Sequence, residues 1–361
     1  MIGRHNRTGG RLLAVFLSGV WRESVPDPKV SAEELREIIP LLLGSGAGAL
    51  GWWGIRNSSL KTDTAASELL QAYRFHALNT ALYQHKIKQA LSILHTADIE
   101  PILIKGWANA RLYPEPGLRP YGDVDLCVRR DRYAVAVELL LNTTEGRKCQ
   151  VDLHRSLGRL DDRAWEEFYT RSQLVNLDEI EVRVLSPEDH LHILSVHMLE
   201  DGAWRPIQLC DIAAVIESAP SNFDWDVCLG RNRRRAKWIA SSIYLANQLL
   251  GANVECCPPK IRNTRLPTWL IPNVLRHWER PCLEQHRPPE LIMKTLRHPT
   301  RVPKAALQRW PDPIGATIRL KGPFNAIPRL PFQLADFFVQ TARFIDRPLR
   351  LLQNSRSASP Y

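Results

Sequence analysis

The alternation of apolar and polar positions divides this chain into helical and strand-like segments. Apolar side chains recur every three or four positions through residues 65–94, which predicts one long helix. Residues 31–56 also have helical spacing, interrupted by a glycine-rich break. Short apolar or alternating runs predict strands at 101–105, 121–128, 150–153 and 180–185.

Helical patterns separate and follow the predicted strands. We expect helices at 107–113, 130–141, 161–170, 188–200, 209–218 and 236–250. Strands and helices therefore alternate in the middle of the chain, and the second half is helical. The pattern predicts a mixed α/β (α+β) fold in which a small sheet carries helical additions at both ends.

Two carboxylates stand close together in the predicted strand 121–128. Asp123 and Asp125 are separated only by Val124, so in a strand both side chains point to the same face. Two like charges this close are unfavourable unless a cation lies between them. Carboxylate oxygens suit Mg²⁺, which in proteins usually works beside phosphate groups. The pair therefore predicts a phosphoryl-transfer site.

A third carboxylate follows on the predicted strand 150–153. Asp152 lies between two apolar residues there, and the helical segment 130–141 connects the two acidic strands. A strand–helix–strand order lets the second acidic strand lie beside the first and bring Asp152 to Asp123 and Asp125. Three carboxylates on adjacent strands would hold two metal ions that clamp attacking and leaving oxygens.

The residues before this strand suit a phosphate group. Gly106 follows the predicted strand 101–105 directly, and a glycine at a strand-to-helix turn lets backbone N–H groups approach an anion. Lys105 and Arg119 could add positive charge on either side of a triphosphate. A solvated lysine and an arginine paired with a surface carboxylate are the alternative interpretations.

The stretch KGWANARLYPEPGLRPYGDVDLCV, with VDLH downstream, resembles an uncharacterised nucleotidyltransferase family of the DNA polymerase beta-like superfamily. The similarity extends over residues 65–250. It implies a small mixed β-sheet nucleotidyltransferase core, in which Asp123 and Asp125 match the metal-binding pair and Asp152 matches the third carboxylate. Gly106 matches the glycine that opens the nucleotide pocket.

The resemblance also implies substrates and cofactors. We expect an Mg²⁺-dependent nucleotidyltransferase that uses two ions, with Mn²⁺ as an alternative, and an NTP, with ATP expected, as donor to an unidentified acceptor. One departure stands out, because the superfamily usually has Gly-Ser or Gly-Gly after the first strand and this chain has Lys105-Gly106-Trp107. Phosphate binding then passes to Lys105 and Arg119, or the nucleotide pose differs, or the activity is low.

Positive charge is concentrated at one end of this chain of 361 residues. The net charge is +10, and residues 258–361 hold 18 Lys and Arg against 6 Asp and Glu, with 16 of the 26 prolines. We expect four segments: an N-terminal helical segment at 1–64, the nucleotidyltransferase core at 65–185, a helical region at 186–257 and a basic tail at 258–361. The rival to the enzyme is a non-catalytic module of this fold that binds nucleic acid or an anionic membrane through the tail.

Two segments could contact a membrane or the core. Residues 332–345 have the spacing of an amphipathic helix, which predicts packing on the core, with a membrane-surface or partner-helix role as the alternative. Residues 38–55 carry no charge but contain five glycines, which favours a buried helix–turn pair over a membrane span.

The cysteines and histidines add less specific signals. Seven scattered cysteines without a CxxC pattern predict reduced thiols and a cytoplasmic protein. His190, His192 and His197 are interpreted as hydrogen-bonded histidines of a helix. His154 lies two residues after Asp152, on the same strand face, so it either lies near the substrate or makes an ordinary hydrogen bond.

Overall fold

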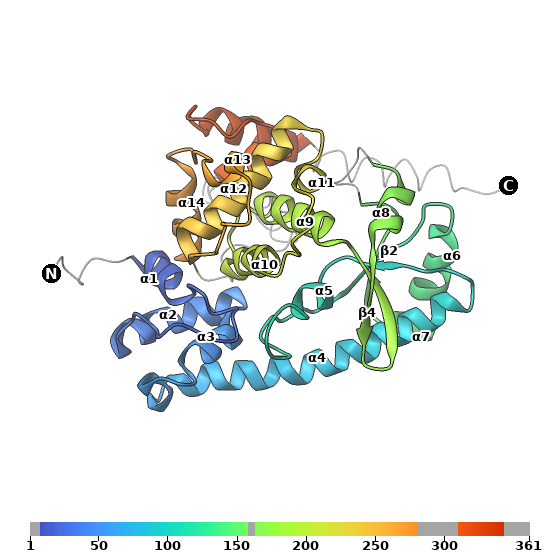
Figure 1. The fold of residues 1–361 in the computed structure, drawn as a ribbon, viewed down its shortest axis with the longest axis horizontal. Helices are drawn as coiled ribbons and strands as arrows, with labels where there is room; N and C mark the ends of the chain where they lie inside the picture. Colours follow the sequence, from blue (N-terminus) through green and yellow to red (C-terminus); the bar gives the residue numbers. More distant parts are fainter. Residues whose placement is uncertain (1–7, 158–162, 281–309, 343–361) are drawn as a thin grey trace, which may run out of the picture.

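The computed structural model describes residues 8–157, 163–280 and 310–342 and contains one mixed sheet flanked by helices (Figure 1). The sheet has five strands in the order β3-β2-β1-β5-β4. Its strands are β1 Ile102–Leu103, β2 Val124–Cys127, β3 Val151–His154, β4 Gln173–Leu177 and β5 Ile180–Val184. Strand β1 pairs antiparallel with β2 and parallel with β5, whereas β2 and β3 are parallel. The predicted mixed α/β class is therefore confirmed.

The N-terminal helices and the sheet are joined by one long helix. Helices α1 Gly9–Phe16, α2 Ala32–Ser45 and α3 Gly48–Ile55 precede the turn η1 Ser59–Thr62 and the 30-residue helix α4 Ala66–His95. Figure 1 shows α4 running from the N-terminal helices to the sheet. Leu69 near its start belongs to the helical core, whereas Ile87, Leu91 and Leu94 pack in the core beneath the sheet.

Short helices connect the strands, and longer ones form the second half of the fold. The connecting elements are α5 Trp107–Ala110, α6 Tyr133–Val137, the π-helical turn η2 Glu138–Asn142, α7 Thr144–Lys148 and α8 Trp165–Arg171. The later helices are α9 Pro187–Glu200, α10 Pro206–Glu217, α11 Trp225–Leu229, α12 Arg233–Leu250, α13 Pro259–Arg262, α14 Leu270–Trp278 and α17 Pro313–Arg319. Helices α9 and α10 are buried along most of their length.

Most predicted elements are present, with shifted ends. The predicted strand 121–128 is shorter, because β2 begins at Val124 and Asp123 precedes it. The predicted helix at 130–141 divides into α6 and the π-helical turn. Strand β4 was not predicted, and it pairs with β5 as an antiparallel hairpin.

Parts of the basic C-terminal segment pack into the protein. Ile261, Trp278 and Phe324 are buried in the same apolar cluster as helices α9, α10 and α12. A helix is present at 330–342, and residues 343–345 of the predicted amphipathic helix lie outside the described residues. The expectation that its apolar positions pack inward is wrong for Leu334 and Phe338, which are exposed.

The orientation of this helix follows from an ion pair. Asp336 is buried and lies 2.7 Å from Arg319 of α17, so the face of the helix that carries Asp336 turns toward the protein and the face with Leu334 and Phe338 turns toward solvent. The boundaries of the four predicted segments remain a prediction. Among the helices described, none combines the length and the apolar character that a membrane crossing requires. The six described cysteines are not in disulfides.

Candidate functional site

A cleft of about 680 Å³ lies between the sheet, α4 and the helices α9 and α10. Five of the six residues predicted for the site line it: Lys105, Gly106, Arg119, Asp123 and Asp125. The α4 wall of the cleft carries Phe75, His76, Asn79, Leu82, Tyr83 and Lys86, and the opposite wall carries Leu194, His197, Arg205, Gln208 and Asp211. The fold therefore brings the strand residues and the later helices to one cavity.

Gly106 forms the turn that leads from β1 into α5. Its φ of +59° and ψ of −111° belong to a region that residues with a Cβ rarely adopt. A Cβ here would lie 3.4 Å from the carbonyl oxygen of Asp123. This backbone conformation explains why a glycine occupies the position and brings the start of α5 close to the carboxylates.

Asp123 and Asp125 lie in different environments although they are two residues apart. Asp123 is accessible to solvent at the cleft, whereas Asp125 on β2 is buried. Partial desolvation, followed by the negative charges of Asp125 and Asp152, raises the pKa of the Asp123 carboxyl. This repulsion indicates that the three carboxylates share one electrostatic environment in which a cation would be stabilised.

Two basic side chains contact the buried carboxylate of Asp125. Its Oδ1 lies 2.7 Å from Nζ of Lys105 and 3.2 Å from Nε2 of His154. Burial alone would raise the pKa of Asp125, but the hydrogen bond with His154 and the positive charge of Lys105 outweigh burial and lower it. Asp125 therefore remains ionised, as a metal ligand must be.

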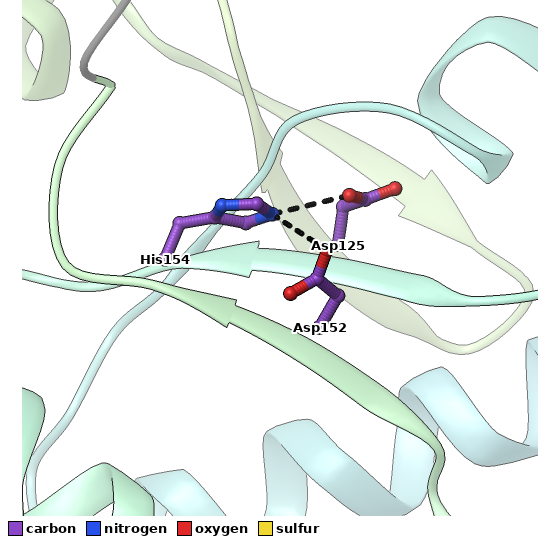
Figure 2. A group of neighbouring side chains, drawn as sticks. All are labelled: Asp125, Asp152 and His154. Carbon is purple, nitrogen blue, oxygen red and sulfur yellow. Dashed lines mark hydrogen bonds and ion pairs between the residues drawn. The ribbon is translucent and has the colours of Figure 1, made fainter. Parts of the chain in front are cut away.

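Asp152 lies beside Asp125 because β2 and β3 are in register. The two aspartates are directly paired across the parallel strands, and His154 follows two residues later on the same face of β3. Nε2 of His154 lies 3.4 Å from Oδ2 of Asp152 (Figure 2). Donor atoms of Asp125, Asp152 and His154 all lie within 4.8 Å of one another, so this group could hold a metal ion.

Arg119 is held at the cleft by a buried aspartate of α10. Its Nε and Nη2 donate to the carboxylate of Asp211, with the shortest distance 2.8 Å, and its Nη1 donates to the carbonyl of Pro120. Asn109 and Tyr113 also donate to Asp211. The alternative of a surface partner for Arg119 is therefore wrong, because Asp211 is only 1% exposed.

Two contributors to the site were missed or weighted too low from the sequence. His154 was left between two interpretations, although its spacing from Asp152 already placed both on one strand face. Asp211 was not predicted for the site, and its signal in the sequence is a single carboxylate in the apolar helix segment LCDIAAVIE.

The histidines of α9 are buried or partly buried. His190 and His192 are buried, and His192 bonds to the carbonyl oxygen of Cys228. Burial lowers the pKa of His190 to about 4, so this imidazole is neutral at physiological pH. His197 lies 3.5 Å from Asp201 and lines the cleft.

Comparison with known proteins bears on the whole core. Searches of curated proteins and of solved structures found no significant match. The model of a family described as uncharacterised nucleotidyltransferases matches residues 52–251, more than half of the chain. The matched region contains the sheet, the cleft and the three aspartates, and it extends slightly beyond the resemblance seen at 65–250. This chain therefore belongs to the uncharacterised nucleotidyltransferase family.

Proposed function

We propose that this protein transfers a nucleoside monophosphate from an NTP, ATP being expected, to an acceptor hydroxyl or phosphate and releases pyrophosphate. The observation that carries the proposal is the pairing of Asp125 with Asp152 on parallel strands, where Asp123 and Asp125 line the cleft. In the reaction the acceptor oxygen bonds to the α-phosphorus, and the bond from that phosphorus to the bridging α–β oxygen breaks. The displaced pyrophosphate carries away the electron pair of the broken bond.

The residues present fit divalent ions. The ammonium of Lys105 lies 2.7 Å from Asp125, its charge also acts on Asp123, and carboxylate oxygens are preferred ligands of Mg²⁺. Asp123 and Asp125 would hold the ion that accompanies the triphosphate, and Asp125 and Asp152 would hold the second. Bound ions supply charge neutralisation for the phosphates and for the attacking oxygen.

The remaining residues bind and orient the substrates. The turn at Gly106, which has no side chain, would let the backbone approach the phosphates. Arg119 keeps one N–H of Nη1 and one of Nη2 beyond its bonds to Asp211 and Pro120, and these would donate to a phosphate oxygen. Asp152 is exposed and would accept the proton of the acceptor hydroxyl.

Lys105 takes the place of the family's missing serine. Its ammonium already neutralises Asp125, and when an ion binds it would turn to the terminal phosphates. Positioning and charge neutralisation supply most of the rate in phosphoryl transfer, so a lysine can replace the hydroxyl contact.

The test uses nucleotides labelled at two positions. The protein is incubated with a cell extract, Mg²⁺ or Mn²⁺, and ATP labelled in the α- or the γ-phosphate. We expect α-label in the product and γ-label in pyrophosphate, with both lost in Asp125→Asn. Asp131→Asn is the matched control, because this exposed aspartate pairs with Arg129 away from the cleft.

Two outcomes would contradict the proposal. Transfer of the γ-label to the product would show phosphoryl transfer instead of nucleotidyl transfer. NTP binding that needs no metal and is unchanged in Asp125→Asn, with no labelled product, would favour the non-catalytic module.

A further inference from the structure

One of the donor atoms beside Asp125 is a nitrogen, so the proposed metal position at Asp125 and Asp152 differs from the position between Asp123 and Asp125. Nε2 of His154 faces both Asp125 and Asp152, whereas Asp123 is not part of this group. Resting on the proposed function, we propose that His154 is a ligand of the second ion and makes this position select a first-row transition ion such as Mn²⁺ over Mg²⁺.

The distances fit ligands of one ion. Two ligands at right angles around an ion with bonds of about 2.1 Å lie about 3.0 Å apart. Nε2 of His154 lies 3.2 Å from Oδ1 of Asp125 and 3.4 Å from Oδ2 of Asp152. A contraction of a few tenths of an ångström would bring Nε2 to ligand spacing from each of the two oxygens, and the paired register of β2 and β3 holds the backbones of the two aspartates side by side.

An imidazole at this position is poorly explained as a hydrogen-bond donor alone. A neutral imidazole carries one N–H, yet the same nitrogen faces two carboxylate oxygens. The Oδ1 atom that it approaches is also bonded by the ammonium of Lys105. Each hydrogen donor near the two carboxylates already faces one of them. In the other tautomer of His154 the Nε2 lone pair would bind a divalent ion, and that ion would contact both carboxylate oxygens at once.

The ligand type decides the selectivity. Mg²⁺ strongly prefers oxygen ligands and keeps several waters, whereas imidazole nitrogen suits first-row transition ions, among which Mn²⁺ binds most weakly. The position between Asp123 and Asp125 offers oxygens only, and the triphosphate would add more. The two proposed ions are therefore chemically unequal: an Mg²⁺ position at the triphosphate and a transition-ion position at His154.

The experiment titrates the full-length protein with Mn²⁺ alone, with Mg²⁺ as competitor, and records pulsed electron paramagnetic resonance of the bound Mn²⁺. We expect the modulation that a directly bonded imidazole ¹⁴N produces. In His154→Asp, which keeps a ligand but changes nitrogen to oxygen, Mn²⁺ should still bind while the modulation disappears. The ratio of Mn²⁺ to Mg²⁺ affinity should fall about tenfold or more, the scale of effects seen when metal sites are perturbed.

A control separates His154 from the histidines that line the cleft. His76 lines the same cleft on α4 but is outside the Asp125 group, so His76→Gln should keep the modulation and the ion preference. Mn²⁺ bound to the wild-type protein without the ¹⁴N modulation, or an unchanged preference in His154→Asp, would overturn the role of His154. Neither result would affect the labelling test of nucleotidyl transfer, whereas failure to bind any divalent ion would refute both.

Discussion

The buried pair of Arg119 and Asp211 allows a quantitative test of how the helical half supports the site. The side chains are 14% and 1% exposed, and the carboxylate accepts hydrogen bonds from Arg119, Asn109 and Tyr113. In Asp211→Asn an amide NH₂ replaces one carboxylate oxygen, so donors face a donor and the guanidinium loses its counter-charge. Removing one partner of a buried ion pair costs about 3–5 kcal/mol. We expect a loss of this size in the free energy of unfolding.

The assay is denaturant unfolding followed by tryptophan fluorescence and circular dichroism, with slopes compared between variants. Asp226→Asn is the control, because Asp226 pairs with Lys260 at the surface and is 87% exposed, so its loss should leave the midpoint unchanged. The double variant Arg119→Met with Asp211→Leu removes both charges and should recover part of the loss, because Asn109 and Tyr113 still lack their acceptor.

Binding provides a second measurement of the same change. Because Asp211 orients Arg119, Asp211→Asn should also weaken NTP binding at a temperature where the variant is folded. An Asp211→Asn variant as stable as the Asp226→Asn control, and with unaltered NTP affinity, would refute the reasoning.

Three further changes test other parts of the structure. Gly106→Ala should cost about 1–3 kcal/mol of stability and weaken NTP binding in calorimetry, because its φ of +59° is strained for alanine; an equally stable variant would contradict this. Burial would raise the pKa of Glu217, but the hydrogen bond from Arg22 lowers it below 4.5, so its stabilisation is present above pH 4.5 and lost on acidification. The stability difference between wild type and Glu217→Gln should therefore shrink from pH 6 to pH 3 in urea titrations, and a constant difference would argue against the pair. Deleting residues 258–361 should abolish cooperative unfolding in near-ultraviolet circular dichroism, because the segment supplies buried core residues; a folded truncation that binds NTP would instead support a separable recognition tail.

Local pattern was sufficient to predict several of the elements that form the candidate site. The two-residue spacing of Asp152 and His154 places both on one face of β3, whereas Asp123 precedes β2 and only Asp125 lies on that strand. The strand–helix–strand order predicted that β3 lies beside β2, and the register of Asp125 with Asp152 confirms it. The glycine between a strand and a helix predicted the turn at Gly106, since few other residues adopt its backbone conformation.

Partners far apart in the chain were decided by the tertiary structure. Arg119 and Asp211 are 92 residues apart, and nothing in the local pattern of either predicts that they meet. Leu334 and Phe338 follow an amphipathic pattern, yet they are exposed, because the ion pair of Asp336 with Arg319 turns another face of their helix inward. Periodicity shows which residues share one face of a helix or strand. What that face contacts depends on how all the other helices and strands pack. The sequence by itself therefore determined the strands that carry Asp125 and Asp152. Only the tertiary structure determined which basic side chains and which helices surround them.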